Sequence, residues 1–488
     1  MSRPYREAFE YRFSALSPDA AHVDPPAMAV YETLLVRGPD GLPAPALAQS
    51  WSISPDQLTW DLTLAADRTF HSGTAVTATE VVATLEALRR DCLPGDRQLW
   101  YWDPVAGIEA VDPRTVRLSL HHPCPRLFTL LWGTHTAIHE ESARKAMGER
   151  FGRTQASGTG PYRLASWDPQ RIELTRVHPD REQPDSMAFI WLPTAKERCA
   201  ALLEDEVDCA HALDADGLAA LADDPRFATC RQPQSSNMYL ALDWTRDELG
   251  FDDVRVRRAI SLAIDRERLV RVGLGGLGAP AYGPLPPGLG FHDPVAATGS
   301  HDPARARALL SAAGWEPGQD GICCRGTARA VTECVIQDDP TFARVFDLLA
   351  QDLRAIGIEL RPRAVTAFAD FYAAVQQHPA ASMSKWLWPD PVEALIGFAS
   401  TSTAPFPNWQ RASSPELDRA FDRFTRAVDD AGHQAAASDI QRIFVRDLPY
   451  VPLVTPDDTW AWNVRVLGFT PRPGDLYPSY DPLRLWPT

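Results

Sequence analysis

The sequence contains no uninterrupted apolar run of the roughly 20 residues that a membrane-spanning helix needs. Its first segment, MSRPYREAFEYRFSALSPDAAHVDPP, also lacks the apolar core of a secretory signal. Glu7, Glu10, Arg12 and Asp19 interrupt every candidate run there. We therefore expect no membrane insertion and, for the chain as written, a cytoplasmic location.

The eight cysteines show no framework spacing and form no CxxC pair. Scattered cysteines of this kind are typical of small buried thiols in a reducing compartment. Because their number is even, disulfides remain possible. The cysteines are Cys92, Cys124, Cys199, Cys209, Cys230, Cys323, Cys324 and Cys334.

Positive charge is in deficit, with 48 Lys and Arg against 64 Asp and Glu and a formal net charge of -16. A sequence-independent grip on phosphate backbones needs clustered basic residues, so we expect no nucleic-acid partner. Such a charge favours a soluble, self-repelling protein, and we expect a monomer.

Catalytic and cofactor motifs are also missing: the sequence has no P-loop, no GxSxG elbow and no Cys/His dyad. The run GLGGLG at 273–278 follows a predicted helix and opens none, so it cannot cradle a pyrophosphate. His135 and His139 are four residues apart but have neither the glutamate of a HExxH motif nor a third ligand. We expect no metal and no cofactor.

What the sequence does contain is an alternation of strand and helix patterns along 488 residues, a length that predicts two or three lobes. LTWDLTL, from Leu58, and MYLALDW, from Met238, have the composition of strands. Helices are predicted over 77–90, 197–221 with a break near Asp205, 254–274 and 302–313. Asp302 and Thr77 have the spacing of helix N-caps. This order of elements predicts an α/β fold.

Six segments in order give this chain a resemblance to the bacterial extracellular solute-binding proteins of family 5, which serve ABC importers of oligopeptides, dipeptides and nickel. They are PALAQSW, TFHSGTAVTATEVV, GTGPYRLASW, VRVRRAISLAIDRERLV, DPARARALLSAAGW and PYVPLV. The resemblance implies a two-lobed, hinged clamp of the type II periplasmic-binding-protein class, with an extra small domain on the first lobe. It also implies an ABC permease as partner if the protein is exported, and a periplasmic or surface-anchored location.

The domain boundaries expected from the resemblance are discontinuous. Lobe I would take residues 1–38, 158–248 and 456–488, the extra domain 39–157, and lobe II 249–455. The hinge would lie near 243–253 and 454–458. Ligand would be captured between the lobes by hinge closure.

The stretch KWLWPDP, residues 385–391, is where the resemblance places a ligand-facing segment of the second lobe. In the peptide binders of the family, an aspartate about four residues before the final proline pairs with the α-amino group of the peptide. Leu387 holds that position here, and the nearest carboxylate is Asp390. Either the loop is shifted and Asp390 takes this role, or the ligand has no amine anchor.

Tryptophans gather in this stretch and in two others, LWYWD and PNWQ. Indole rings bury large apolar area, keep one N–H donor and stack on rings or cations, so they suit an aromatic or cationic ligand. Each tryptophan can equally be a core residue. The candidate ligand-binding residues are Trp100, Trp102, Trp386, Trp388, Asp390, Asn408 and Trp409.

Two functions remain open from the sequence. The first is capture of a short peptide or a peptide-sized aromatic or cationic metabolite, without chemistry. The alternative is a cytosolic enzyme that performs a cyclisation, condensation or hydrolysis in a closed cleft. In that case Asp390 would be the first acid or base to test, and Tyr162 the second.

Overall fold

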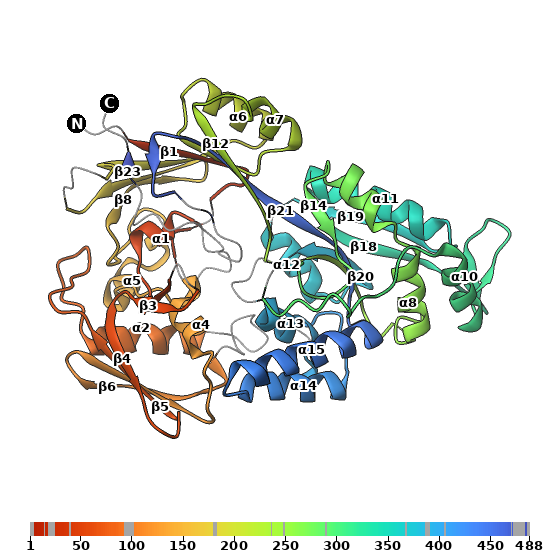
Figure 1. Cartoon of the computed structure of the whole chain (residues 1–488), viewed down its shortest axis with the longest axis horizontal. Helices are drawn as coiled ribbons and strands as arrows, with labels where there is room; N and C mark the ends of the chain where they lie inside the picture. The colour runs from red at the N-terminus through yellow and green to blue at the C-terminus, as the bar shows by residue number, and fades with distance from the viewer. Residues whose placement is uncertain are drawn as a thin grey trace. The chain divides into compact units, whose positions relative to one another are not determined.

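The chain passes between two compact units, and within the described residues it crosses at Gln232–Pro233 and at Asp457–Asp458. Unit 1 comprises residues 1–93, 101–232 and 458–488, and unit 2 comprises 94–100 and 233–457. Figure 1 shows the elements in a computed structural model of the chain. The described residues are 4–13, 15–17, 25–38, 41–91, 102–178, 183–235, 237–246, 249–287, 290–366, 368–385, 391–404, 407–469, 471 and 484–485.

The main sheet of unit 1 has a parallel centre. β1 (Tyr5–Phe9) runs parallel to β10 (Ser186–Trp191) on one side and to β11 (Cys209–His211) on the other. Antiparallel strands β9 (Arg171–Arg176) and β8 (Tyr162–Asp168) extend the sheet beyond β10. On the other edge, β11 pairs with the second half of the long strand β21 (Val451–Asn463), and β12 (Phe227–Pro233) also pairs with β21.

A second sheet of unit 1 is antiparallel, in the order β4-β5-β7-β6. Trp60, Leu62 and Leu64 of β5 are buried and alternate with less buried residues, as the strand pattern predicted. Helix α2 (Ala78–Asp91) packs on β6 and β7 (Figure 1). Thr77 accepts a hydrogen bond from the Glu80 amide, which confirms the predicted N-cap. The strands are β4 (Ala48–Ile53), β5 (Thr59–Leu64), β6 (Val105–Asp112) and β7 (Thr115–Leu120).

The other elements of unit 1 are short. They are α1 (Ala27–Val30), β2 (Leu35–Arg37), β3 (Pro43–Pro45), α4 (Leu127–Trp132), η1 (Thr134–Thr136), α5 (Glu141–Met147), η2 (Gly148–Arg150), α6 (Ala195–Leu203), α7 (Ala215–Leu221), β22 (Val466–Leu467) and β23 (Arg484–Leu485).

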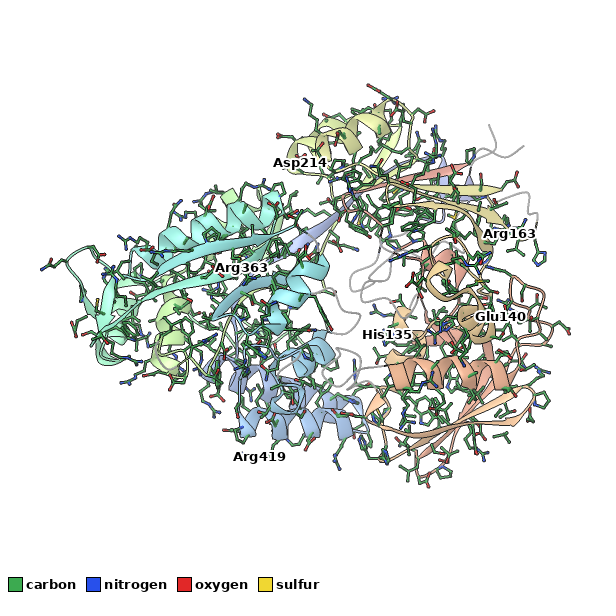
Figure 2. All side chains as sticks on the ribbon, turned by 180° about the vertical axis from the view of Figure 1, so that it is seen from behind. His135, Glu140, Arg163, Asp214, Arg363 and Arg419 are labelled. Carbon is green, nitrogen blue, oxygen red and sulfur yellow. The ribbon has the colours of Figure 1, made fainter. Side chains whose placement is uncertain are left out.

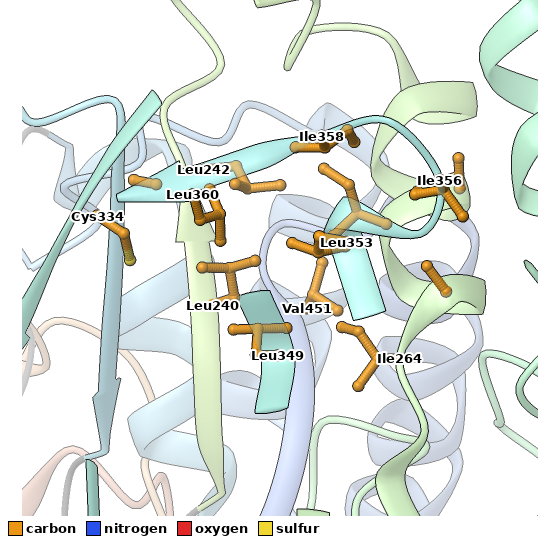
Figure 3. Close-up of a cluster of buried hydrophobic side chains, with 14 of the residues drawn as sticks. Leu240, Leu242, Ile264, Cys334, Leu349, Leu353, Ile356, Ile358, Leu360 and Val451 are labelled. Atoms are coloured by element: carbon orange, nitrogen blue, oxygen red, sulfur yellow. The ribbon is translucent and has the colours of Figure 1, made fainter. Parts of the chain in front are cut away.

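The sheet of unit 2 has the order β19-β18-β20-β13-β21, with β14 also on β21. β18 runs parallel to β19 and β20, whereas β13 is antiparallel to both β20 and β21. Buried side chains from β13, α11 and β21, among them Leu240, Leu353 and Val451, meet in one apolar core (Figure 3). The strands are β13 (Met238–Leu242), β14 (Gly278–Pro280), β18 (Val331–Gln337), β19 (Glu359–Val365) and β20 (Ala381–Lys385).

Helices and a small sheet, β15-β16-β17, complete unit 2. Asp302 caps α10 through the Arg305 amide, with Pro303 in the first turn, as the sequence predicted. The elements are α8 (Val254–Ala263), α9 (Arg266–Arg268), η3 (Leu269–Gly273), α10 (Pro303–Ala312), β15 (Glu316–Pro317), β16 (Cys323–Arg325), β17 (Ala328–Arg329), α11 (Pro340–Arg354), α12 (Phe368–Gln376), α13 (Pro391–Ala399), η4 (Thr401–Thr403), α14 (Pro415–Arg426) and α15 (Asp430–Asp447).

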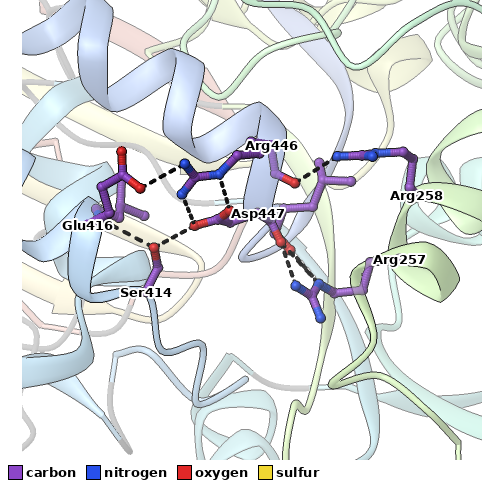
Figure 4. A network of polar contacts seen from close by, with 8 residues as sticks. Arg257, Arg258, Ser414, Glu416, Arg446 and Asp447 are labelled. Carbon is purple, nitrogen blue, oxygen red and sulfur yellow. Dashed lines mark hydrogen bonds and ion pairs between the residues drawn. The ribbon is translucent and has the colours of Figure 1, made fainter.

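The end of α15 is fixed by arginines from α8 (Figure 4). The Arg257 guanidinium donates to the carbonyl oxygens of Asp447 and Leu448, which the end of the helix leaves without intrahelical partners. Arg258 donates to the Arg446 carbonyl oxygen in the same turn. Burial lowers the pKa of Arg257 to about 10, so the group stays charged at neutral pH. Three residues later the chain enters β21, so this contact fixes where that strand begins.

The predicted α/β class is confirmed, but two predicted helical stretches were wrong in part. Residues 197–221 do more than break near Asp205: they form α6 and α7 with β11 between them, because Cys209–His211 pairs with β1 and β21. Residues 254–274 do not form one continuous helix, because Ile264 is extended, with φ -84° and ψ 121°. Asp265 then caps α9 by accepting the Arg268 amide, and a π-helical turn follows over Leu269–Gly273. The expected start of lobe II at 249 stays a prediction. The division of unit 1 into a lobe and an extra domain stays a prediction.

Candidate functional site

The parallel strands of unit 1 end together, and polar residues follow them. Ligand sites in open α/β sheets lie beyond the carboxyl ends of parallel strands. Glu10 directly follows β1, and His211 is the last residue of β11. His211 pairs with Trp460 of β21, two residues after the crossing into unit 1. This register brings residues from three distant parts of the chain to one end of the sheet.

Glu10, His211 and Asp458 form a bridge at this end. The His211 Nδ1 atom lies 2.9 Å from Glu10 Oε2, and its Nε2 atom lies 3.8 Å from Asp458 Oδ1. The imidazole also packs against the Trp460 indole in a tilted arrangement, with ring centroids 4.1 Å apart, and contacts Phe9 at 5.7 Å. The Glu10 side chain is 32% exposed, whereas those of His211 and Asp458 are each 13% exposed. A dissolved group can therefore reach Glu10 more readily than the other two.

The two carboxylates hold His211 in its charged form. Burial alone would lower the pKa of His211, but the charges of Glu10 and Asp458 outweigh it and raise the pKa to about 9. Burial would likewise raise the pKa of Glu10, yet the charge of His211 and its hydrogen bond lower it to about 2. At neutral pH the bridge is an imidazolium with a carboxylate on each side.

Arg198 fixes the backbone beneath this bridge. Its guanidinium donates to the carbonyl oxygens of His211 at 2.7 Å and of Leu192 and Ala212 at 2.6 Å. These carbonyls lie at the ends of β10 and β11, where the strand ladders no longer supply donors. The side chain comes from α6, whose first turn is fixed by a capping box between Thr194 and Glu197. Arg198 thereby fixes the ends of both strands through their backbone carbonyl oxygens.

In unit 2, KWLWPDP follows the carboxyl end of the parallel strand β20, which ends at Lys385. Lys385 pairs with Met238, the first residue of β13, and Met238 pairs in turn with Val454 of β21. The crossings at Gln232–Pro233 and Asp457–Asp458 are therefore close in sequence to the end of the unit 2 sheet from which this segment starts. Residues 386–390 lie outside the described ranges, and α13 begins at Pro391.

Two buried groups fix β21 within unit 2 before the crossing. The Asn237 amide donates to the Gly283 and Pro284 carbonyl oxygens at 3.0 Å and accepts from the Thr455 hydroxyl at 2.6 Å. Arg266 is 1% exposed and donates to the carbonyl oxygens of Ala281 and Pro452 at 2.8 Å. Burial lowers the pKa of Arg266 to about 10, so it too is charged at neutral pH.

Comparison with known proteins places this architecture in one family. The sequence model for "Bacterial extracellular solute-binding proteins, family 5 Middle" matches residues 43–406. The chain belongs to this family.

Relatives and solved structures agree with this assignment. "Glutathione-binding protein GsiB" of Salmonella choleraesuis is 26% identical over 455 residues, which cover 89% of this chain and 85% of the relative. The oligopeptide-binding protein AppA of Bacillus subtilis, solved with a nonapeptide, superposes with a TM-score of 0.86 at 19% identity and covers 99% of both chains. NikZ of Campylobacter jejuni, solved with Ni(L-His), gives a TM-score of 0.83 at 20% identity and covers 96% of both chains. The fold is that of a type II periplasmic binding protein, as predicted.

Two of the segments that carry the family resemblance meet in unit 1. The amide of His71, from TFHSGT, donates to the Gly158 carbonyl oxygen, and its ring Nε2 lies 2.9 Å from the Gly160 carbonyl oxygen. A Cβ on Gly160 would lie 2.5 Å from the Ala29 carbonyl oxygen, and one on Gly158 would overlap the Val30 carbonyl oxygen. Glycines are needed here because two backbones pass in contact.

Of the seven predicted ligand-binding residues, Trp386, Trp388, Asp390 and Trp100 lie outside the described residues. Trp102 is buried in unit 1, with 4% exposure. A shared ligand site for the predicted tryptophans stays a prediction.

Trp409 and Asn408 are buried in unit 2. The Trp409 indole donates to the Ser382 hydroxyl at 2.9 Å and contacts the rings of Tyr239 and Phe398. Asn408 donates to two backbone carbonyls, of Ser400 and Ala412, and accepts from the Ala412 amide. These contacts give both side chains a structural role, because a ligand would have to displace them.

Tyr162, the second candidate acid or base of the alternative enzyme, is also buried. It is 1% exposed, and its hydroxyl donates to the Pro184 carbonyl oxygen at 2.9 Å. Arg176 donates to the Tyr162 hydroxyl oxygen at 3.3 Å. With both contacts made, the hydroxyl serves to hold β8 against neighbouring backbone.

Among the described residues, no three His, Cys, Asp or Glu side chains gather closely enough to hold a metal ion. The described cysteines are free thiols. No helix within the described ranges combines the length and apolarity needed to cross a bilayer.

The bridge residues Glu10, His211 and Asp458 were missed from the sequence. Each stands alone in its segment, and only the pairing of β11 with β1 and β21 joins them. A carboxylate or imidazole at the end of a predicted strand is a candidate site residue. Which of these residues meet can be predicted only once the order of the strands is known.

Proposed function

We propose that this protein captures a short peptide, or a peptide-sized aromatic or cationic metabolite, as the binding component of an ABC importer. The observation that carries the proposal is the family match over residues 43–406. Solved proteins of this fold are described in complex with a nonapeptide, with Met-Leu, with agropinic acid and with Ni(L-His), so the fold alone leaves the ligand class open.

The ligand class is proposed from KWLWPDP. Its position after the end of β20 supports a role beside the crossings, where hinge closure of the two lobes would bring Trp386 and Trp388 to a ligand. Asp390 would then bind a ligand amino group, and the indoles would bind an aromatic or cationic part. Trp100 and Trp102 remain proposed contacts, and the buried positions of Trp409 and Asn408 favour supporting roles.

Partner and location are parts of the same proposal. Handing a ligand to an import permease requires the protein to act on the outer side of the cytoplasmic membrane, and we propose that it does so as a monomer. The cytoplasmic location expected from the first residues stays a prediction, and fractionation of the native host distinguishes the two.

A thermal-shift screen of the purified protein tests the proposal. The panel contains glutathione, Met-Leu, a nonapeptide, an aromatic amine and nickel with histidine. A ligand at about 100 times its Kd stabilises the native state by about 2.7 kcal/mol. Stabilisation by a peptide or an aromatic amine supports the proposal. Stabilisation by nickel with histidine alone, or by no member of the panel, contradicts it.

A further inference from the structure

β21 is a single strand whose two parts belong to different units. Its first part, 451–456, is held in unit 2 by pairing with β13 and β14 and by the Thr455–Asn237 hydrogen bond. Its second part starts at Asp458 and is held in unit 1 by pairing with β11. The bridge through His211 is therefore a side-chain contact at the first residue of the strand inside unit 1.

We propose that His211, by bridging Glu10 and Asp458, is the positioning residue that anchors the crossing strand to unit 1 and so regulates ligand capture. This inference rests on the proposed function for its link to capture. The anchoring itself rests only on contacts within unit 1.

The chemistry of imidazole makes the anchor dependent on charge. A protonated ring donates from both nitrogens, whereas a neutral ring has a single N–H. With that N–H given to Glu10 at 2.9 Å, a neutral ring presents its lone pair to the Asp458 carboxylate. The attraction between Nε2 and Asp458 then becomes a repulsion, and the strand start loses its attraction to His211.

The other charged groups around the bridge leave this attraction in place. Arg198 of α6 lies close enough to Glu10 to help lower its pKa, but it reaches His211 only through the backbone carbonyl. Asp214, at the start of α7 (Figure 2), interacts with Arg198. On the far side of β21, Cys230 of β12 has its pKa raised by burial and by the Asp458 charge, so it is a neutral thiol. The immediate partners of His211 are thus the two carboxylates.

The direction of the pH effect follows from these contacts. A group whose pKa is raised in the anchored state stabilises that state at low pH and stops doing so as pH rises through the raised value. For His211 the anchor is complete below its ordinary value of 6.5 and is lost as pH passes about 9. Capture should therefore weaken at alkaline pH.

The first test is hydrogen exchange of the full chain and needs no ligand. His211→Gln removes the charge and keeps a polar side chain, and His178→Gln serves as control because His178 is an exposed residue outside the bridge. At pH 7 the Ala212 amide, which donates to the Thr459 carbonyl oxygen, is expected to exchange about tenfold faster in His211→Gln than in wild type or control. Amides of β13 should be unchanged. Equal exchange at Ala212 in all three proteins would overturn the anchor.

The second test measures binding and titration together. Affinity for glutathione, or for Met-Leu if glutathione does not bind, is measured by calorimetry from pH 7 to 10, and the His211 ring is titrated by NMR. We expect the His211 ring to titrate with a midpoint near pH 9 in wild type. Above that pH, affinity should fall about tenfold in wild type and in His178→Gln. In His211→Gln it should stay level. The same pH profile in all three proteins would overturn the link to capture. If neither probe binds while Ala212 behaves as expected, the proposed ligand class fails and the anchor stands.

Discussion

Replacing Trp409 tests whether this tryptophan is a core residue or a ligand contact. The ring is 2% exposed, packs against Tyr239 and Phe398 with centroids 6.2 and 5.7 Å away, and donates to Ser382 at 2.9 Å. Trp409→Ala removes this packing and leaves a cavity, which costs about 3–5 kcal/mol in buried sites. Trp409→Phe keeps most of the ring and loses the indole donor, for which we expect a cost of about 1–2 kcal/mol.

Urea denaturation gives the free energy of unfolding of each variant, and calorimetry with the best probe from the thermal-shift panel gives its affinity. We expect both variants to lose stability, Trp409→Ala more than Trp409→Phe. Trp409→Phe should bind the ligand with wild-type affinity. Wild-type stability together with a large loss of affinity would refute the reasoning, because the ring would then contact ligand instead of filling the core.

Three further changes follow from the described contacts. Arg266→Met should destabilise the fold by several kcal/mol, since the Ala281, Pro452 and Ser261 carbonyl oxygens lose a buried donor; an unchanged urea midpoint would contradict this. Gly158→Ala should lower the melting temperature because its Cβ meets the Val30 carbonyl oxygen, whereas Gly107→Ala, with nothing nearby, should not; equal melting would argue against the close approach. Because the pKa of Glu10 is lowered to about 2, its stabilising effect should be complete above pH 4.5 and be lost as pH falls toward 2, while Glu10→Gln lacks that part of the acid dependence; parallel acid-denaturation curves would refute the ion pair.

Local patterns predicted much of the fold. Thr77 and Asp302 were recognised as helix N-caps because capping depends on residues three apart in the sequence. MYLALDW was recognised as a strand from its composition, and β13 is buried throughout. The break after Ala263 was missed because a capping aspartate and a buried arginine, Asp265 and Arg266, decide it through contacts that the apolar spacing does not reveal.

The candidate site was predictable only in part. The aromatic composition around KWLWPDP could be read directly, but burial could not, and Trp409 and Asn408 proved to be buried residues with structural partners. The Glu10–His211–Asp458 bridge was out of reach because its members are joined by strand order and register alone. Tertiary pairing is the information that a single sequence lacks.

Native mass spectrometry of the protein incubated with the best compound of the panel tests the central claim most directly. Capture without chemistry predicts a complex of one chain with one ligand, and release of that ligand at unchanged mass after denaturation. A ligand recovered at a new mass, or no complex at a concentration that raises the melting temperature, would contradict the account of this chain as a solute-capturing protein.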